Sequence, residues 1–317
     1  MKKKMISLIF SFRNEQSNLE ELIKRAEKTL ESIRYDYEII FIDDDSIDGS
    51  YKILEENRER NNKIKIIKMS RRFGISPCVL AGFSHSSGDA IIYMDSDLQD
   101  PPELITELIS KWEDGNDVVH TIRTKRKGEN AFRMFLTNIA YKIIDSISDI
   151  KIRHNSGDFK LISRRAVDTI LELNDHDPFL RGLSAWVGFK QTNIFYEREP
   201  RFKGSSKFSL LNSSGMYKDF IRGITTFSSV PLYLSLYVGL IVSLSSFAFI
   251  LYIILKKFLF GIDNSGWASL MVVSLFLGGS ILFSIGIQGI YIGKIYESVK
   301  SRPRYIVEFK KGFDNIK

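Results

Sequence analysis

Two long stretches without charged residues constrain this chain more than any other feature of its sequence. Neither the 32 residues of 224–255 nor the 30 residues of 264–293 include Asp, Glu, Lys or Arg. A helix that crosses a lipid bilayer needs about 20 apolar residues, so each stretch is long enough to cross once. The alternative is a pair of helices buried in a soluble core, but such helices seldom run this far without a charge.

The distribution of charge predicts how these helices would lie in a membrane. The chain has a net charge of +7. Its tail after the second stretch is rich in basic residues: Lys294, Lys300, Arg302, Arg304, Lys310, Lys311 and Lys317. Cytoplasmic flanks of membrane helices carry an excess of Lys and Arg, so we expect this tail, and the large N-terminal domain with it, in the cytoplasm. Lys256 and Lys257 in the connecting loop weigh against this orientation.

The first half of the chain alternates between strand and helix patterns. Apolar and β-branched runs predict strands at 5–12, 38–42, 63–69, 90–94 and 117–121. Helical patterns predict helices at 18–33, 50–60, 77–85 and 102–112. This alternation is typical of an α/β fold with a mainly parallel sheet, and such sheets bind ligands at the carboxyl ends of their strands. The basic N-terminus superficially resembles a signal peptide, but its apolar run is short and leads into Arg13, Asn14 and Glu15.

These patterns divide the chain into four parts. We expect an α/β domain at 1–212, an amphipathic interfacial segment at 213–229, two transmembrane helices at 230–293 and a basic cytoplasmic tail at 294–317. A plain linker helix is the alternative for the second part. Cys78 is the only cysteine, which excludes an intramolecular disulfide and fits a reducing compartment.

An acidic cluster follows the second predicted strand. It contains Asp43, Asp44 and Asp45. Carboxylates at a strand end can accept hydrogen bonds from a nucleotide base or a ribose hydroxyl. The alternative is an acidic turn that caps the next helix through Asp48 or Ser50.

A second acidic cluster follows the strand at 90–94. It contains Asp95 and Asp97, with Gln99 close behind. Two carboxylates and an amide oxygen at a strand end predict a site for Mg²⁺ or Mn²⁺, because these ions take oxygen ligands and bridge proteins to substrate diphosphates. The alternative is an Asp-x-Asp in an ordinary surface turn.

Basic clusters occur after the strand at 117–121, beginning with Arg123, and again at 198–207. Dense Arg and Lys with Gly and Ser can hold a phosphate, although a generic juxtamembrane basic belt would look similar. Asp158 stands within a basic stretch, where it can either face a reaction centre or pair with Arg153 or Arg164.

In their order along the chain, these motifs resemble those of the inverting glycosyltransferases of the Rossmann-like GT-A fold. The resemblance rests on residues 10–15, the two acidic clusters, and the segments 71–74, 81–83 and 87–89. The segments 157–164, 179–182, 186–189 and 201–207, and the two apolar stretches ending at 292–297, look like the polyprenyl-phosphate glycosyltransferases. This group includes dolichol-phosphate mannose synthases and bactoprenol glucosyltransferases. The resemblance covers nearly the whole chain, and the two-span C-terminus looks closest to the bactoprenol branch.

The resemblance implies roles for particular residues. The metal would be held by Asp95, Asp97 and Gln99. The nucleotide-sugar pocket would be lined by Ser11, Arg13, Glu15, Asp43, Asp45, Arg72, Gly74, Asp95 and Ser96. The lipid phosphate would be bound by Arg123, Arg201, Ser205 and Lys207. Asp97 and Asp158 would serve catalysis, and we expect Asp158 to position groups more than to abstract a proton.

The sequence departs from the family pattern in places. Asp45 stands where the family usually has Gly, and Ile47 where it often has Thr, which bears on the base and ribose contacts. Lys160 replaces a common Arg, so the charge is kept but a bidentate donor is lost.

The reaction that the resemblance implies is sugar transfer from a UDP-sugar to polyprenyl (undecaprenyl) phosphate with inversion. Glucose is the first choice of sugar, with N-acetylglucosamine close behind. A membrane-bound homotetramer without a nucleic-acid partner is expected from the family alone.

Other classes of protein fit the sequence less well. A processive polysaccharide synthase should carry Gln-x-x-Arg-Trp, but none of Trp112, Trp186 and Trp267 follows an Arg. A dinucleotide-dependent oxidoreductase should have a Gly-rich turn after its first strand, and residues 10–15 contain no Gly. A nucleic-acid binder would explain the charge but not the apolar stretches. A non-catalytic membrane scaffold stays open, although the intact acidic residues argue against it.

Overall fold

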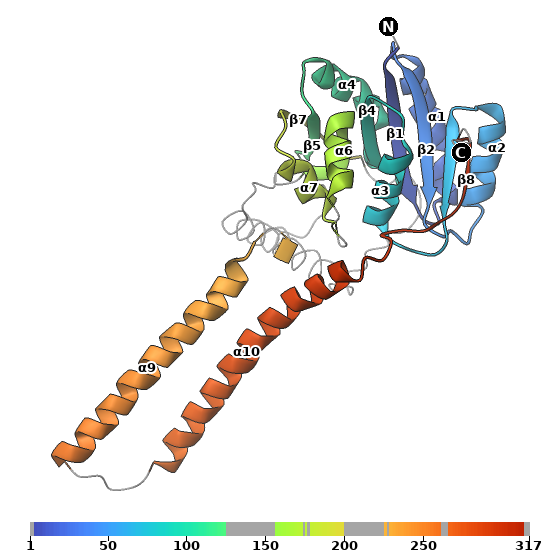
Figure 1. Ribbon diagram of the computed structural model, residues 1–317. Helices are drawn as coiled ribbons and strands as arrows, with labels where there is room; N and C mark the ends of the chain where they lie inside the picture. The colour runs from blue at the N-terminus through green and yellow to red at the C-terminus, as the bar shows by residue number, and fades with distance from the viewer. Residues whose placement is uncertain are drawn as a thin grey trace. The chain divides into compact units, whose positions relative to one another are not determined.

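The computed structural model describes residues 3–124, 156–173, 175, 178–199, 225–226, 228–260 and 266–313. The predicted alternation of strands and helices is confirmed in the first half of the chain (Figure 1). Its elements are β1 (Met5–Phe12), α1 (Gln16–Glu31), β2 (Asp36–Asp43), α2 (Ser50–Arg60), β3 (Ile64–Met69), α3 (Ile75–His85), β4 (Ala90–Asp95), η1 (Pro102–Leu104), α4 (Ile105–Glu113) and β5 (Val118–Arg123). The later elements are β6 (Ser156–Ser163), α6 (Arg164–Glu172), α7 (Leu180–Trp186), β7 (Gln191–Tyr196), α9 (Val230–Phe260), α10 (Trp267–Val299) and β8 (Val307–Lys311).

The described strands form one sheet in the order β7-β5-β6-β4-β1-β2-β3-β8. The central strands β4, β1, β2 and β3 are parallel, as is the outer pair β5 and β7. β6 is antiparallel to both β4 and β5, and β8 is antiparallel to β3. The prediction of a mainly parallel sheet is therefore confirmed.

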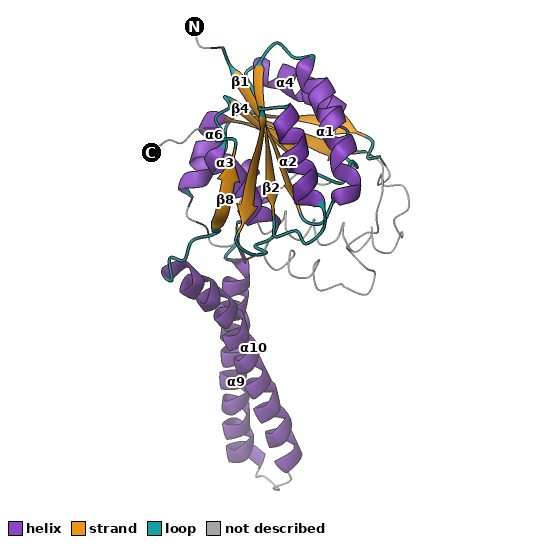
Figure 2. Ribbon diagram, turned by 90° about the vertical axis from the view of Figure 1, so that its right-hand side faces the viewer, coloured by secondary structure: helices purple, strands orange, loops and turns teal. Residues whose placement is uncertain are grey.

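Helices cover both faces of this sheet, with α1, α2 and α4 on one side and α3 and α6 on the other (Figure 2). The spacing of apolar residues explains how α1 packs, because Leu19, Leu22 and Ala26 fall on one face of the helix and are all buried. On the opposite face α3 packs closely, since a Cβ on Gly82 would lie 2.6 Å from the side chain of Ile9.

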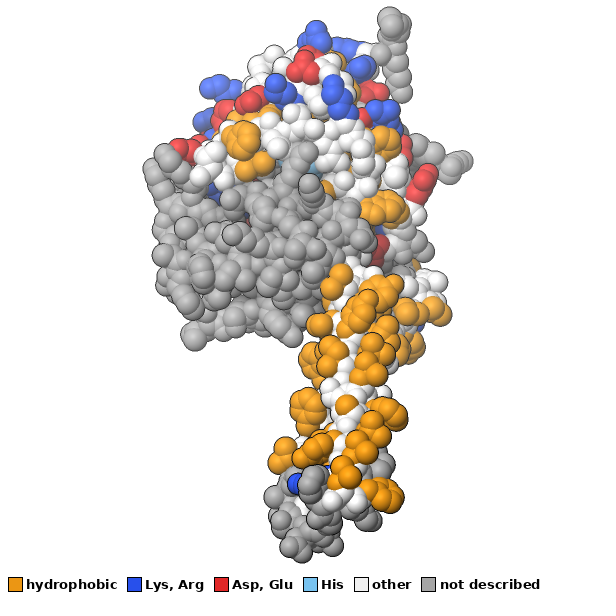
Figure 3. Space-filling view, turned by 90° about the vertical axis from the view of Figure 1, so that its left-hand side faces the viewer, with side chains coloured by type: hydrophobic (Ala, Val, Ile, Leu, Met, Phe, Trp, Pro, Cys, Tyr) orange, Lys and Arg blue, Asp and Glu red, His pale blue; other side chains and the backbone are white. Residues whose placement is uncertain are grey.

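The two apolar stretches form α9 and α10, which make up a second compact unit. By length and composition Val230–Ile253 and Leu270–Val299 are candidate membrane spans. Most of their described side chains are not buried by protein, as Leu244 (62% exposed) and Phe276 (63% exposed) illustrate, so the alternative of core helices is wrong. Figure 3 shows hydrophobic side chains covering these helices. Within the unit, the Tyr291 hydroxyl donates to the Ser228 carbonyl (2.8 Å).

The chain after α10 returns to the sheet, which the prediction of a basic tail at 294–317 overlooked. α10 continues to Val299, and residues 307–311 form the edge strand β8. The alternation of Val307 and Phe309 with charged residues is the strand pattern that a count of charges misses. Phe309 packs edge-on against Tyr51 of α2, with their ring centroids 5.6 Å apart.

Arg304, just before β8, connects this segment to α6. Its guanidinium donates to the carbonyls of Leu173 (3.0 Å) and Leu171 (3.3 Å), which lie at the C-terminal end of that helix. Such carbonyls have no partner within the helix and carry its negative dipole end, so a cation there is stabilising.

We predict that Arg304→Met lowers the unfolding free energy of the unit that contains the sheet by about 1.5–3 kcal/mol, because charged hydrogen bonds contribute about that much. Urea unfolding in detergent, followed by fluorescence of Trp112 and Trp186, measures the change. Arg302→Met, at an exposed position nearby, is the control and should have little effect. Equal stability of the two variants would contradict the capping role.

Candidate active site

The sheet register brings the predicted nucleotide residues together. Phe12 at the end of β1 pairs with Asp43 of β2, and Ser11 pairs with Asp95 of β4. The carboxyl ends of three parallel strands therefore meet at one edge of the sheet, where ligands bind in folds of this type. Both acidic clusters lie at these strand ends, as the sequence predicted, and this end of the sheet is called the acidic edge below.

The loops after β1 and β2 are locked to each other by hydrogen bonds. The Asn14 amide donates to the Ser46 hydroxyl (2.9 Å), and the Arg13 Nε–H donates to the Asp45 carbonyl (3.4 Å). Asp45 has φ of 60°, in the left-handed region that Gly adopts most easily and Asp tolerates. Gly would adopt this conformation without strain, so the backbone here is compatible with the Gly that the resemblance leads one to expect.

Asp43 offers an acceptor that the protein does not use. Its Oδ1 accepts the Ser46 amide (2.8 Å), while its Oδ2 is buried and has no hydrogen-bond partner among the described residues. Burial raises the pKa of the Asp43 carboxyl. A buried acceptor without a donor is costly, so this oxygen is suited to an N–H of a ligand.

Asp44, to which the sequence gave no separate role, positions the loop after β3. Its carboxylate accepts the amides of Phe73 (2.6 Å) and Gly74 (3.0 Å). Gly74 has φ of 93°, which requires Gly. This contact brings Arg72 and Gly74 to the same edge of the sheet, with the Arg72 side chain exposed.

Glu15 lies at the start of α1 and is buried. Its carboxylate accepts the Asn18 side-chain amide (2.6 Å), and its backbone amide donates to the Ser50 hydroxyl (3.1 Å). These contacts hold Glu15 against α1 and Ser50, and its contact with the nucleotide stays a prediction.

The predicted metal ligands lie on one loop after β4. The Tyr93 hydroxyl donates to Asp95 Oδ1 (3.2 Å), and Asp97 Oδ1 accepts the Gln99 amide (3.1 Å). Ser96, on the same loop, lies with its hydroxyl 3.5 Å from the Ser11 carbonyl. No group of three or more His, Cys, Asp or Glu that could hold a metal ion occurs among the described residues. The predicted site thus offers two carboxylates and one amide oxygen, and its binding of a metal stays a prediction.

The Arg123 side chain contacts the same loop, residues 96–100, which is called the acidic loop below. Its guanidinium lies 3.4 Å from the fully buried Asp100 carboxylate, and its Nε–H donates to the Tyr196 hydroxyl (3.1 Å). A side chain at Gly157 would crowd this guanidinium, because an added Cβ would lie 3.0 Å from it. Arg123 thus joins β5 and β7 to the acidic loop, and its binding of the lipid phosphate stays a prediction. The other residues predicted for that role, Arg201, Ser205 and Lys207, lie outside the described part of the chain.

Asp158 faces α7, a contact that the sequence did not reveal. The Arg181 Nε–H donates to Asp158 Oδ1 (2.9 Å), and its second guanidinium nitrogen pairs with the other oxygen. Of the two partners considered from sequence, Arg153 lies outside the described residues. Arg164 donates instead to the carbonyls of Gly88 (2.9 Å) and Ser86 (2.9 Å). The buried Lys160 donates to the Ser184 hydroxyl (3.1 Å), which fixes α7 to β6 at a second point.

These contacts set the charge of the site. Burial opposes ionisation of Asp158, but the charges of Arg181, Lys160 and Arg123 outweigh it and hold the pKa of Asp158 far below its usual range. Burial raises the pKa of Asp95, and the nearby Asp158 carboxylate adds to that effect. Burial also lowers the pKa of Lys160 to about 8. Asp158 is therefore an ionised carboxylate and a poor base, while Asp95 favours a nearby cation.

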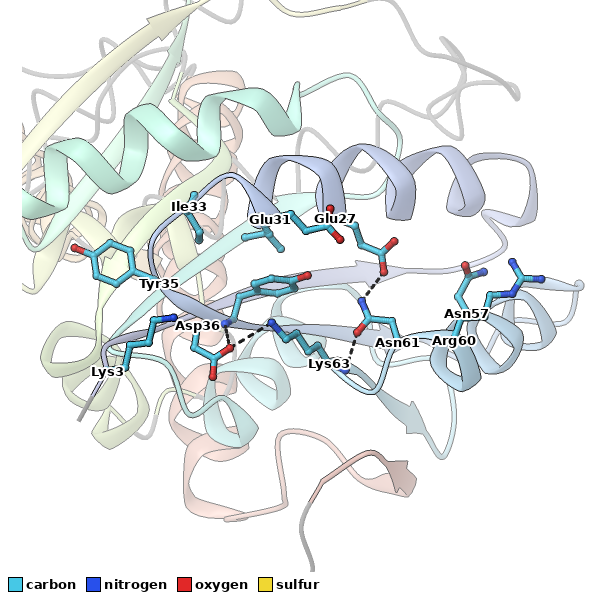
Figure 4. A pocket seen from close by; sticks show the side chains of 12 residues that line it. Lys3, Glu27, Glu31, Ile33, Tyr35, Asp36, Asn57, Arg60, Asn61 and Lys63 are labelled. Atoms are coloured by element: carbon cyan, nitrogen blue, oxygen red, sulfur yellow. Dashed lines mark hydrogen bonds and ion pairs between the residues drawn. The ribbon is translucent and has the colours of Figure 1, made fainter. Parts of the chain in front are cut away.

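A groove at the opposite end of the sheet is a different feature (Figure 4). Lys63 lies 3.4 Å from the Asp36 carboxylate and stacks over the Tyr37 ring, and Asn61 donates to Glu27 (2.6 Å). Its polar groups thus satisfy one another. Asp36 begins β2 and Asp43 ends it, which places the groove about 23 Å from the acidic edge at 3.3 Å per residue.

Comparison with known proteins assigns the chain to a family. Residues 7–171 match the model of Glycosyl transferase family 2. A protein of Synechocystis described as an uncharacterized glycosyltransferase is 42% identical over 98% of this chain and 97% of its own. The SfII prophage-derived bactoprenol glucosyl transferase of Shigella flexneri is 38% identical over 96% of this chain and 97% of its own. The crystal structure of glucosyl-3-phosphoglycerate synthase from Mycobacterium tuberculosis with Mn²⁺, UDP-glucose and phosphoglyceric acid is 18% identical and covers 70% of this chain and 79% of its own, with a TM-score of 0.46.

The chain therefore belongs to glycosyl transferase family 2. It is a glycosyltransferase whose catalytic unit has the GT-A fold, and the resemblance drawn from the sequence is confirmed.

We predict that Arg181→Met lowers the unfolding free energy by about 1.5–3 kcal/mol at pH 7, where Asp158 is charged. A depressed pKa in the folded state adds stability above the unfolded pKa, about 3.9 for Asp, and this stability is lost as pH falls through the folded pKa. The difference from the wild type should therefore shrink below about pH 4.

Urea unfolding across pH measures this difference. Arg34→Met is the control, because Arg34 is exposed and its pair with Glu113 should contribute little. A difference that does not change with pH would show that Arg181 does not act through the Asp158 charge.

Proposed function

We propose that this chain transfers a sugar, glucose first, from a UDP-sugar to undecaprenyl or another polyprenyl phosphate, with inversion. The main support is that the match to a bactoprenol glucosyl transferase extends over 96% of the chain, through the catalytic unit and the two apolar helices. N-acetylglucosamine or another sugar is the alternative donor.

The acidic edge of the sheet supplies the donor site of this proposal. Asp43 presents a buried acceptor for a base N–H, and Ser11, Arg13, Glu15, Asp45, Arg72, Gly74 and Ser96 complete the pocket. Asp95, Asp97 and Gln99 would hold Mg²⁺ or Mn²⁺, because their donor atoms are the oxygens that these ions prefer. When bound, the metal would stabilise the charge that develops on the leaving diphosphate.

In this proposal the nucleophile is a phosphate oxygen of the acceptor lipid. A phosphate monoester has a second pKa near 6, so its oxygen is already ionised at neutral pH. That oxygen attacks the anomeric carbon while the bond from this carbon to UDP breaks, which inverts the centre. Arg123, Arg201, Ser205 and Lys207 would bind the lipid phosphate, and Asp158, held ionised by Arg181, positions groups rather than taking a proton.

The path of the chain supports a membrane hairpin. β8 follows α10 yet lies in the same sheet as β1–β4, so both ends of the α9–α10 pair lead to one folded unit on one side of the membrane. The basic residues after α10 support a cytoplasmic location for that side. On this proposal residues 1–212 form the catalytic domain, 213–229 the interfacial segment, 230–293 the membrane domain and 294–317 a tail that includes β8. Assembly as a homotetramer remains a prediction.

Sugar transfer in detergent tests the function directly. Purified protein is incubated with undecaprenyl phosphate, a panel of radiolabelled nucleotide sugars and Mg²⁺ or Mn²⁺. We expect labelled lipid from UDP-glucose, reduced about 100-fold or more in Asp97→Ala, since losing one transition-state charge contact costs about that much. No labelled lipid from any donor, in a preparation that still binds nucleotide sugars, would contradict polyprenyl phosphate as the acceptor.

Asp158→Asn should lower kcat, because the variant loses the charge that positions groups in the site. The loss should persist at every pH between 6 and 9, because the acceptor oxygen is already ionised and needs no base. The pH profile of transfer is the measurement, with Asp36→Asn in the groove of Figure 4 as the control that keeps wild-type activity. Full recovery of the Asp158→Asn rate at high pH would instead show that Asp158 abstracts a proton.

A further inference from the structure

Arg198, two residues after β7, lies between two carboxylates of the acidic loop. Its guanidinium is 3.9 Å from Asp97 Oδ2 and 3.5 Å from Asp100 Oδ1. The side chain is 27% exposed, so solvent screens these charges only in part. Nothing in the proposed function gives this residue a role.

Asp100 and Asp97 differ in the hydrogen bonds and ion pairs that they receive from the protein. Asp100 is fully buried, accepts the Tyr196 hydroxyl and pairs with Arg123. Asp97 accepts only the Gln99 amide in the described part of the chain, and Arg198 is the cation paired with it there. Of these two carboxylates, Asp97 is therefore the one whose negative charge the protein compensates less.

The contact with Arg198 is loose. The buried Nε–H of Arg198 has no hydrogen-bond acceptor within the described residues, although it lies 3.5 Å from Asp100. An ion pair 3.9 Å apart is weaker than a short charge-assisted hydrogen bond, so a divalent cation can replace the guanidinium at Asp97. Near Asp97, a divalent ion and the guanidinium would repel each other.

Arg198 is also tied to the acidic loop through the backbone that follows it. The Glu199 amide donates to the Gln99 carbonyl (3.0 Å), next to Asp100. From Glu199 the chain continues directly to Arg201, Ser205 and Lys207, the residues expected to bind the lipid phosphate. A change at Arg198 therefore occurs next to the hydrogen bond that joins Glu199 to the acidic loop.

We propose that Arg198 is a stand-in cation: it neutralises Asp97 while the site holds no metal and leaves Asp97 when a divalent metal binds. This inference rests on the proposed metal-dependent function. Asp100 keeps its bonds to Tyr196 and Arg123 during the exchange, so the loop stays in place while the guanidinium is released. Arg198 is then free to meet a phosphate, and loading of the donor site is linked to the acceptor segment.

Binding of Mn²⁺ alone, without nucleotide, tests the exchange. Titration calorimetry or electron paramagnetic resonance on the full chain in detergent measures the affinity. We expect Arg198→Met to bind Mn²⁺ about 3- to 10-fold more tightly than the wild type, because the competing charge is gone. Arg198→Lys keeps the charge and should stay near the wild-type affinity.

Arg25→Met is the matched control. Arg25 pairs with Glu103 (2.7 Å) and Glu199 (3.4 Å) in the same region but contacts neither Asp97 nor Asp100 by an ion pair. Its Mn²⁺ affinity should stay within about twofold of the wild type. If Arg25→Met raised the Mn²⁺ affinity as much as Arg198→Met, the change would follow from the loss of any nearby positive charge. That result would overturn the stand-in role.

The remaining outcomes separate the two proposals. Unchanged or weaker Mn²⁺ binding by Arg198→Met, with binding abolished in Asp97→Ala, would refute the stand-in role and leave the metal site intact. Wild-type Mn²⁺ binding by Asp97→Ala would remove the metal site itself. If Arg198→Met folds poorly, Arg198→Gln takes its place: it should also bind Mn²⁺ more tightly than the wild type, and unchanged affinity would refute the stand-in role.

Discussion

The parallel pairing of β1 with β2 and β4 is the constraint on which the site depends. This register sets Phe12 beside Asp43 and Ser11 beside Asp95, so residues more than 80 positions apart in the sequence share one sheet edge. The loops that follow the strands then interlock, through Asn14 and Ser46 on one side and Asp44 and Gly74 on the other. A shift of one residue would turn every side chain to the opposite face and dismantle this edge.

Several carboxylates lie close together at this site, and their mutual repulsion is destabilising. Arginine side chains offset this repulsion at some of the carboxylates but not at others. Arg123 compensates Asp100 through hydrogen bonds from its guanidinium, and Arg181 compensates Asp158 through two parallel hydrogen bonds. Asp95 and Asp97 receive less compensation, which is why we propose this edge as the site for a metal and a diphosphate. Asp158 is a poor base because the positive charges around it, Arg181 foremost, keep it ionised. The proposed phosphate acceptor would not need a base, since it is already charged.

Local patterns in the sequence were sufficient for the strands and helices up to β5 and for the place of Asp95 and Asp97 at a strand end. They could not show that β6 inserts antiparallel between β4 and β5, because that pairing joins segments far apart in the chain. For the same reason the bond between Arg181 and Asp158 was missed, since nothing in either motif specifies a partner 23 residues away. β8 had a local signal, the alternation at Val307 and Phe309, which the interpretation as a basic tail concealed.

The site at the carboxyl ends of β1, β2 and β4 is tested most directly by a structure of the full chain with UDP and Mn²⁺. Anomalous scattering from manganese would locate the metal independently of the protein fit. We predict the metal at the Asp97 carboxylate, with the uracil directed toward Asp43. Metal or nucleotide bound instead in the groove lined by Asp36 and Lys63 would contradict the assignment of the acidic edge as the donor site.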